Sequence, residues 1–325
     1  MPNEISVPDE LKHLIEKREQ EERRLAERRG DNEGSEDGDR REPSDRRSQP
    51  RRAAESAGDD KLRVKDFWDE ASCGEKLYMQ GSELREQFAN QLKTRYELEP
   101  YIPEFAEFDR WKGQKVLEIG VGLGADHQRF AEGGANLHGV DLTPRAIRNT
   151  HNRFDLLGLK SELQTADAEN LPFKDAEFDM VYSWGVIHHS PNTHKAANEI
   201  HRILKPGGNA RVMIYHSQSF VGYMLWVRYG LLRLRPFTSL RTIYANYLES
   251  PGTKAYSVDE AKQLFERFSS VKIDTVLTHA DLLTSSAGQR HEGGLLNLAR
   301  KIYPRNLIKS WFPKRGLFML ISLVK

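Results

Sequence analysis

Cysteine is almost absent from this sequence: Cys73 is the only one among 325 residues. A single thiol cannot form an intrachain disulfide or a thiolate metal cluster, which excludes disulfide-stapled secreted folds and zinc-ribbon sites. No acidic cluster marks a magnesium site either, so we expect no metal. The chain also lacks an uninterrupted apolar run of the ~18 residues that a membrane-spanning helix needs, and its first residues contain no signal-peptide core. These absences predict a cytoplasmic protein.

Large apolar residues are scarce at the start of the chain. Hydrophobic residues make up 38% of the sequence, a low share for a chain that is folded throughout, and residues 30–60 contain no large one. Such a segment cannot bury enough surface to offset the entropy of ordering. We expect residues 1–60 to be a disordered charged tail and residues 61–325 to form the folded domain. Residues 8–29 are either a solvated extension or a polar helix that binds a partner.

Acidic residues are few in the last third. Residues 201–325 hold 19 Lys and Arg against 7 Asp and Glu, although the net charge of the chain is only +1. A basic region suits an anionic substrate, a phospholipid surface or nucleic acid. This one lacks the interleaved aromatic pattern of a strand-binding surface, so we expect no nucleic-acid partner.

Glycine is concentrated in the stretch KVLEIGVGLGADHQRFAEGGANLHGVD at residues 115–141. Its apolar run at 116–119 predicts a buried strand, which leads into a loop with glycine at positions 120, 122 and 124. Glycine lets the backbone turn sharply and lets a ligand approach the main chain closely. The next strand ends in Asp141, whose carboxylate is placed to accept hydrogen bonds from ribose hydroxyls. This stretch therefore predicts a nucleotide-binding loop.

Strand and helix patterns alternate around that loop. Units of this length predict a parallel sheet with helices on both faces, the doubly wound, Rossmann-like α/β class. The expected strands are 116–119, 136–140, 162–166, 178–183 and 210–215, and the helices between them are 125–132, 143–157 and 192–204. Ser257 with Glu260 predicts a capping box for a helix through Phe268. Two further strands are expected at 271–277 and 316–324.

Several nucleotide-dependent classes share a glycine loop followed by an acidic residue, and three further features narrow the choice. Glu118 lies two residues before the first glycine, where a carboxylate beside a pyrophosphate is unfavourable, so it suits a cationic ligand. Asp167 with Ala168, at the end of the third strand, can accept a hydrogen bond from an adenine amino group. The third feature is the turn LKPGG before the fifth strand.

These residues resemble a known family, the class I S-adenosylmethionine-dependent methyltransferases, and within it the type-11 small-molecule branch that includes ubiquinone and menaquinone methyltransferases. Five segments carry the resemblance in the family's order: VLEIGVGLG, GVDLTPRAI, ADAENLPF, FDMVYSWGVIHHSPN and IHRILKPGG. The resemblance implies an enzyme with S-adenosyl-L-methionine as cofactor and a seven-stranded sheet whose last strand is antiparallel. It does not cover the tail or the helical insertions expected after strand five and between strands six and seven.

The resemblance also assigns residues to the cofactor. It implies that Asp141 binds the ribose, that Asp167 with Ala168 binds the adenine, and that Glu118 lies at the methionine side. The full set of implied cofactor-binding residues is Glu118, Gly120, Gly122, Asp141, Leu142, Asp167, Ala168 and Ser183.

Methyl transfer from a sulfonium depends mainly on holding the nucleophile in line, since proximity and orientation supply most of the effect. A base is needed only if the acceptor must lose a proton. Ligands of open α/β sheets bind at the carboxyl ends of the strands. The candidate bases are therefore His188 and His189 after the fourth strand, and Tyr215 and His216 after the fifth. The alternative for His188 and His189, that they pack or cap the following helix, stays open.

Three segments outside the motifs are expected to enclose the acceptor. Residues 61–109 would form lid helices, and the insertions at 216–256 and 279–315 would form a substrate cap. Residues 219–237 mix apolar, aromatic and arginine side chains, so they either pack as an inserted helix or form a cap with a basic rim on anionic lipid. A lipid-like or quinone-like small-molecule acceptor and peripheral membrane contact are the resulting hypotheses.

Two rival functions belong to other classes. The basic last third alone supports a nucleic-acid methyltransferase. However, residues 183–186 (SWGV) lack the Asn/Asp-Pro-Pro-aromatic pattern of the amine-methylating branch, and Cys73 does not follow a proline as in the pyrimidine C5 branch. The second rival is a non-catalytic S-adenosylmethionine-binding module whose tail recruits a partner.

Overall fold

The structure is a computed structural model of the chain that describes residues 59–69, 83–250, 252–284 and 303–325. These residues belong to one compact unit, Ala53–Lys325. Of the tail predicted at 1–60, only residues 59 and 60 are described, and they belong to a helical segment over 59–69. The rest of that tail prediction lies outside the described residues.

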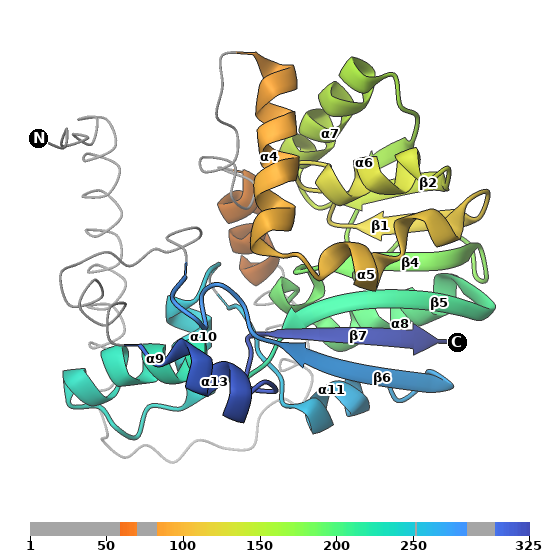
Figure 1. Cartoon of the computed structure of the whole chain (residues 1–325). Helices are drawn as coiled ribbons and strands as arrows, with labels where there is room; N and C mark the ends of the chain where they lie inside the picture. Colours follow the sequence, from red (N-terminus) through yellow and green to blue (C-terminus); the bar gives the residue numbers. More distant parts are fainter. Residues whose placement is uncertain (1–58, 70–82, 251, 285–302) are drawn as a thin grey trace, which may run out of the picture. The chain divides into compact units, whose positions relative to one another are not determined.

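A seven-stranded sheet organises the fold (Figure 1). Its strands in chain order are β1 (Lys115–Ile119), β2 (Asn136–Asp141), β3 (Glu162–Thr165), β4 (Phe178–Trp184), β5 (Leu204–Tyr215), β6 (Ser270–Val276) and β7 (Phe318–Val324). They lie side by side in the order β3-β2-β1-β4-β5-β7-β6. The first five run parallel, and β7 is antiparallel to both of its neighbours. The predicted doubly wound, Rossmann-like sheet with an antiparallel last strand is confirmed.

β1 is buried on both faces of the sheet. Successive side chains of a strand point to opposite faces. Val116 accordingly packs in one hydrophobic cluster, while Leu117 and Ile119 pack in the cluster on the other face. A continuous apolar run is what a parallel strand needs when helices cover both of its faces.

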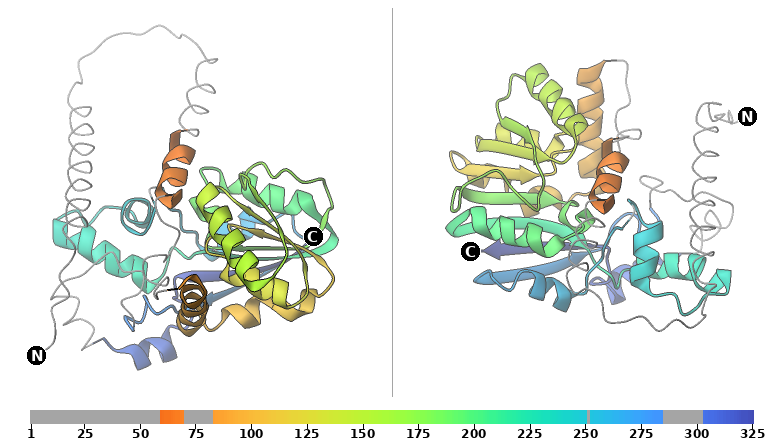
Figure 2. Two further views of the ribbon diagram at one scale, coloured as in Figure 1. Left: turned by 90° about the horizontal axis from the view of Figure 1, so that it is seen from above. Right: turned by 180° about the vertical axis from the view of Figure 1, so that it is seen from behind.

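Helices cover both faces of the sheet, as two further views show (Figure 2). The buried side chains of α8 (Thr193–Ile203) and α11 (Val258–Leu264) join the cluster of Leu117 and Ile119. The helices of the other face are α5 (Ile102–Ala106), the 3-10 helix η1 (Phe108–Trp111), α6 (Ala125–Glu132) and α7 (Pro144–Leu157). α4 (Leu84–Leu98) packs on α6 and α7.

Local signals fix the ends of these helices. Thr143 caps α7 by accepting a hydrogen bond from the backbone N–H of Ala146, and Pro144 is the first helical residue. The capping box of Ser257 and Glu260 at the start of α11 is present as predicted.

Two helical insertions gather where the parallel strands end and β7 begins (Figure 1). The first follows β5 and contains α9 (Phe220–Tyr229), the 3-10 helix η3 (Leu231–Arg233) and α10 (Leu240–Tyr247). The second lies between β6 and β7 and contains α13 (Arg305–Trp311). Their predicted positions in the chain are confirmed. In the described part of the chain, no helix is long and apolar enough to cross a membrane.

Two local predictions are wrong. The LKPGG segment does not form a turn before the fifth strand but lies within β5, which begins at Leu204. Between Leu204 and Asn209 the pairing with β4 shifts, and Gly207 has a φ of +74°, so the extra residues bulge out of the ladder. The helix expected to reach Phe268 ends at Leu264.

Candidate active site

The glycine loop between β1 and α6 needs glycine for two different reasons. Gly120 has a φ of +86°, and a Cβ there would lie 2.1 Å from Cγ2 of Val186. Gly122 has a φ of +52°, but nothing lies within 4 Å of the place where its Cβ would be. Close packing inside the protein thus excludes a side chain at Gly120, whereas Gly122 leaves open space where a ligand can approach.

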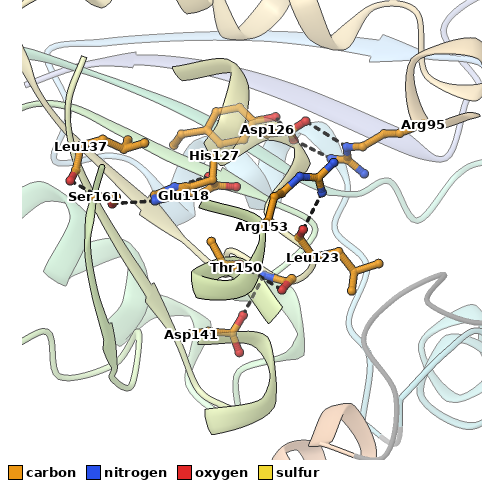
Figure 3. Close-up of polar contacts among 12 residues, drawn as sticks. Arg95, Glu118, Leu123, Asp126, His127, Leu137, Asp141, Thr150, Arg153 and Ser161 are labelled. Atoms are coloured by element: carbon orange, nitrogen blue, oxygen red, sulfur yellow. Dashed lines mark hydrogen bonds and ion pairs between the residues drawn. The ribbon is translucent and has the colours of Figure 1, made fainter. Parts of the chain in front are cut away.

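Asp141 at the end of β2 is held in a fixed orientation. Its Oδ1 accepts hydrogen bonds from the backbone N–H and the hydroxyl of Thr143, both at 2.9 Å. Its Oδ2 accepts one from the backbone N–H of Gly122 at 3.1 Å (Figure 3). Burial raises the pKa of Asp141, and these hydrogen bonds oppose the rise. The carboxylate therefore joins the glycine loop to the start of α7.

A cavity of about 160 Å³ lies beside this carboxylate. Asp141, Leu142, Asp167 and Ala168 line it, and these are the residues that the resemblance implied for the ribose and adenine side. The carboxyl ends of β2 and β3 thus bring two acidic residues to one small pocket, as expected for open α/β sheets.

The helical segment 59–69 closes one side of this smaller cavity. Lys61, Val64 and Trp68 line it. Nζ of Lys61 lies 2.5 Å from Oδ2 of Asp167 and 3.0 Å from Oε2 of Glu169. Burial disfavours the ammonium charge, but the hydrogen bonds to the two carboxylates outweigh it and raise the pKa of Lys61. These ion pairs anchor the segment beside Asp167 and Glu169. Its movement as a lid stays a prediction.

Glu118, at the end of β1, is buried and lines a second, larger cavity. Its Oε2 lies 2.9 Å from Nδ1 of His127. Nε2 of His127 lies 2.8 Å from Oγ of Ser161, which donates a hydrogen bond to the carbonyl of Leu137 at 3.0 Å (Figure 3). The carboxyl group therefore ends a chain of hydrogen bonds that runs behind the glycine loop.

Protons can be placed along this chain of groups. Burial, together with the neighbouring His138, lowers the pKa of His127 to about 3, so its ring is neutral with one N–H. Because Ser161 donates to a carbonyl, its oxygen can accept from Nε2 of His127, which leaves Nδ1 as an acceptor. Glu118 is then the donor. A protonated carboxyl agrees with its environment, since burial and the negative charge of Asp126 raise the pKa of Glu118 well above its ordinary value.

Arg95 of α4 and Asp126 of α6 form a buried ion pair that also lines the larger cavity. Nε and Nη2 of Arg95 donate to both carboxylate oxygens of Asp126, at 2.9 and 2.6 Å (Figure 3). Burial opposes ionisation of Asp126, but the adjacent guanidinium holds its pKa below the ordinary value. Neither residue of this pair is among the site residues predicted from the sequence. Its only signal was an acidic residue in the first turn after the glycine loop, and no spacing pointed to Arg95.

Ser183 is placed differently from the expectation. It is fully buried in β4, its Oγ has no hydrogen-bond partner among the described residues, and it lines neither cavity. The next residues, Trp184 and Gly185, line both cavities. A shift of one residue along a strand moves the side chain to the other face of the sheet, which accounts for the difference.

The candidate bases His188 and His189 lie in the 3-10 helix η2 (Ile187–His189), directly after β4. His189 lines the smaller cavity, and its Nε2 lies 3.4 Å from Oε2 of Glu249. The hydroxyl of Tyr215 donates to the same oxygen at 2.6 Å. His188 is fully buried, and its ring lies 4.1 Å from the ring of Tyr215. The structure thus brings three sequence candidates together and adds Glu249, which lies in an insertion outside every motif.

His216, the fourth candidate base, points elsewhere. It is buried, lines neither cavity, and its Nδ1 lies 3.1 Å from the carbonyl of Gly316. Burial lowers the pKa of His216. Its position fits a structural role between β5 and β7.

The larger cavity has a volume of about 1140 Å³ and adjoins the smaller one. The residues that line both are Trp68, Gly120, Gly122, Trp184 and Gly185. Beyond this shared rim, apolar side chains of the two insertions and of β7 dominate the walls; they include Met224, Leu225, Leu307, Ile308 and Phe318. Tyr215 and Glu249 also line this cavity.

Known proteins match the part of the chain that builds this site. Residues 117–212 match a family model described as a methyltransferase domain. The chain is 35% identical over 113 residues to an uncharacterized protein of Mycobacterium bovis, over 35% of this chain and 41% of that protein. It is 28% identical over 201 residues to the demethylmenaquinone methyltransferase of Tropheryma whipplei, over 57% of this chain and 82% of that protein. A solved S-adenosylmethionine-dependent methyltransferase from Mesorhizobium loti covers 69% of this chain and 97% of its own, with 17% identity and a TM-score of 0.46.

These matches differ in extent. The chain spans less than half the length of the Mycobacterium relative. The family match begins in β1, ends in β5, and contains the glycine loop, Asp141, Asp167 and both histidines of η2. The part of the chain that builds this site, residues 117–212, therefore matches a methyltransferase domain.

Proposed function

We propose that the protein transfers a methyl group from S-adenosylmethionine to a small, largely apolar acceptor molecule. One observation carries this proposal: the cavity lined by Asp141 and Asp167 shares a rim with a much larger apolar cavity. When bound, S-adenosylmethionine supplies a methyl group activated by a sulfonium. The shared rim gives a place where this methyl and an acceptor can meet, which is the main requirement for such a transfer.

The residues present fit this cofactor. Asp141 is already oriented by Thr143 and Gly122, and the open space at Gly122 lets a ligand approach the backbone. The amino-acid end of the cofactor carries an ammonium and a carboxylate. The ion pair of Arg95 with Asp126 lines the larger cavity and offers charged partners of both signs. The buried Glu118 lines the same cavity.

The polar groups for the acceptor lie where the cavities adjoin. Methylation of a hydroxyl requires that its proton leave, and His189, Glu249 and Tyr215 are the ionisable groups gathered there. We propose that this group of side chains, together with the adjacent His188, promotes the loss of this proton. The apolar walls beside this cluster lower the local dielectric constant, which strengthens electrostatic interactions there.

The size and apolar walls of the larger cavity support a lipid-like or quinone-like acceptor. Its volume, about 1140 Å³, is slightly above the ~300–1,000 Å³ of ordinary ligand pockets. The Tropheryma relative is named for methylation of demethylmenaquinone. We carry only the general character of that acceptor over to this chain.

Calorimetry with S-adenosylhomocysteine tests the cofactor site. We expect micromolar binding that weakens at least about tenfold in Asp141→Ala, because a hydrogen bond to a charged group contributes about 1.5–3 kcal/mol. Asp155→Ala, an exposed residue of α7, is the matched control and should bind as the unmodified chain does. Unchanged affinity in Asp141→Ala would contradict the ribose assignment. Transfer of a labelled methyl to pooled lipid and quinone extracts then tests the activity.

We also propose that the insertions contact an anionic membrane. Leu234, Phe237 and Trp311 are 90%, 99% and 70% exposed, an unusual state for large apolar side chains. Several exposed apolar residues also line the larger cavity: Tyr223, Val227, Leu232, Leu307 and Phe312. Arg233 and Arg235 lie beside them in the chain. Exposed apolar side chains next to basic residues suit the surface of an anionic bilayer. An apolar acceptor could enter the cavity from that bilayer.

Flotation with vesicles tests this contact. The chain should float with vesicles of phosphatidylglycerol and phosphatidylcholine, and less so with phosphatidylcholine alone or at high salt, because salt screens the basic residues. Replacing both Leu234 and Phe237 by serine should reduce flotation strongly. Leu84→Ser, an exposed leucine of α4, is the control. If the chain does not float with either vesicle, membrane contact is wrong while the cofactor site is untouched.

A further inference from the structure

His188, His189 and Glu249 form a compact cluster of metal-binding side chains. Each offers a donor atom, and the three atoms lie within 4.8 Å of one another. Both histidines are buried in η2, and Glu249 comes from the residues that follow α10. The end of β4 and the first insertion thus contribute to one group of ligands.

The pair of His189 and Glu249 already has the spacing of two ligands on one ion. Nε2 of His189 lies 3.4 Å from Oε2 of Glu249, and this nitrogen has no hydrogen-bond partner among the described residues. Zinc sites have metal–ligand distances of about 2.0–2.2 Å, so two ligands in tetrahedral geometry lie roughly 3.3–3.5 Å apart. The same distance is long for a direct hydrogen bond.

A turn after Glu249 orients the ring of His189. Nδ1 of His189 lies 2.8 Å from Oγ of Ser250 and 3.2 Å from Oγ1 of Thr253. The hydroxyl of Thr253 donates to the carbonyl of Ser250 at 2.7 Å, so its oxygen is available as an acceptor. Histidine ligands of metals commonly donate their other N–H to an oxygen in this way, which fixes the ring and leaves the ligating nitrogen free of a proton.

His188 supplies an independent observation. It is fully buried, and neither of its ring nitrogens is hydrogen-bonded to any residue that the structure describes. Buried polar groups almost always have a hydrogen-bond partner. A buried imidazole without one is available to bind a metal ion.

The surroundings do not block an ion at this place. The hydroxyl of Tyr215 donates to Oε2 of Glu249 at 2.6 Å and would hold the carboxylate in position. The nearby cation, Lys254, is turned to the carbonyls of Ser190 and Pro191, at 2.5 and 3.1 Å. Tyr215 and Glu249 line the larger cavity, so an ion bound here would be reached from the acceptor side.

We propose that His188, His189 and Glu249 bind one divalent transition-metal ion of the zinc class. Two imidazoles and one carboxylate are the ligand set of catalytic zinc sites and of open iron(II) sites, and they disfavour magnesium. The three donor atoms lie within 4.8 Å of one another, so the donor atom of His188 must approach the other two to complete the set. This proposal differs from the expectation, drawn from the sequence, that no metal binds. That expectation used the spacing of residues close in the sequence, and Glu249 is far from His188 and His189 in the sequence.

The role of the ion rests on the proposed methyl transfer. A bound cation lowers the pKa of a hydroxyl that coordinates it. The proton of an acceptor hydroxyl would pass to solvent water, and the oxygen would keep its electron pair for attack on the methyl. His188 and His189 then act as ligands and not as bases.

The experiment uses the full chain, purified without chelator and also stripped with EDTA. Elemental analysis should find about one zinc-class ion per chain, and the stripped chain should bind Zn²⁺ and Co²⁺ but not Mg²⁺. Bound Co²⁺ should give visible absorption from a tetrahedral or five-coordinate site. Loss of an outer-shell partner costs about 10- to 100-fold in metal affinity, so Tyr215→Phe should fall in that range and Glu249→Gln should exceed it. His194→Ala, an exposed histidine of α8, is the control.

Two outcomes would overturn the proposal: no binding of Zn²⁺ or Co²⁺ to the stripped chain, or equal affinity in Glu249→Gln and His194→Ala. Binding of S-adenosylhomocysteine, measured on the same samples, reports whether each variant is folded. It also separates the two hypotheses. If the unmodified chain binds the ion but not S-adenosylhomocysteine, the proposed function is refuted and the metal site is not. If it binds S-adenosylhomocysteine but no ion, the metal site is refuted and the proposed function is not.

Discussion

Glu118 should release a proton when the cofactor binds. In the cofactor-free protein its carboxyl is a hydrogen-bond donor to His127, and burial raises its pKa well above its ordinary value. A cationic ligand next to this group stabilises the carboxylate and lowers that pKa. Binding at a pH between the lowered and the raised value must therefore expel up to one proton.

The magnitude follows from linkage. If one proton leaves per ligand, affinity rises about tenfold per pH unit, or about 1.36 kcal/mol, up to the raised pKa of the free protein and is constant above it. The free energy of unfolding changes with pH in the opposite direction. The unfolded chain ionises Glu118 near 4.5, while the folded chain keeps the proton, so the cofactor-free protein loses up to about 1.36 kcal/mol per pH unit above pH 4.5.

Calorimetry with S-adenosylmethionine and S-adenosylhomocysteine between pH 6 and 8.5, in buffers of different ionisation enthalpy, counts the protons directly. Glu118→Gln retains a donor for Nδ1 of His127 but cannot ionise, so its affinity should not vary with pH through this group. Glu104→Gln, an exposed residue of α5, should behave as the unmodified chain. The reasoning is refuted if no proton is released, or if Glu118→Gln keeps the same pH slope.

Two further predictions concern the loop and its anchor. Gly120→Ala forces a Cβ against Val186 at a positive φ and should destabilise the fold by about 2–4 kcal/mol; Gly122→Ala should cost about 1 kcal/mol yet weaken cofactor binding, because its Cβ enters open space at the site. Equal stability losses in urea denaturation would contradict this contrast. Arg153 is fully buried and donates to the carbonyl of Leu123 at 2.6 Å. Arg153→Lys should lower the free energy of unfolding by about 2–4 kcal/mol, and an unchanged Tm would show that this anchor is dispensable.

The half of the candidate site that we propose for the cofactor was predictable because its signals are local. Three glycines and an acidic residue at the end of the next strand lie within 27 residues, the stretch 115–141, and parallel strands bring their carboxyl ends to one edge. Asp167 follows the same rule one strand further on. The strand assignment also placed His189 and Tyr215 at that edge, where the structure has them.

The other half depends on contacts that no spacing encodes. Arg95 meets Asp126 because α4 packs on α6, and Glu249 meets His189 because the first insertion folds back to β4. Such pairs follow from tertiary packing and not from periodicity. Ser183 shows a finer limit. Its strand was identified, but the face to which each side chain points depends on register, and a slip of one residue reverses it.

The carboxylate of Asp141 is bonded to the amide of Gly122 before any ligand arrives. The loop has therefore already lost its conformational freedom during folding, and association need not order it again. The entropic cost of ordering this loop is thus met when the chain folds and does not arise again on binding. Ligand affinity at this end of the site should thus vary among mutants mainly through the dissociation rate, with an association rate that stays nearly constant.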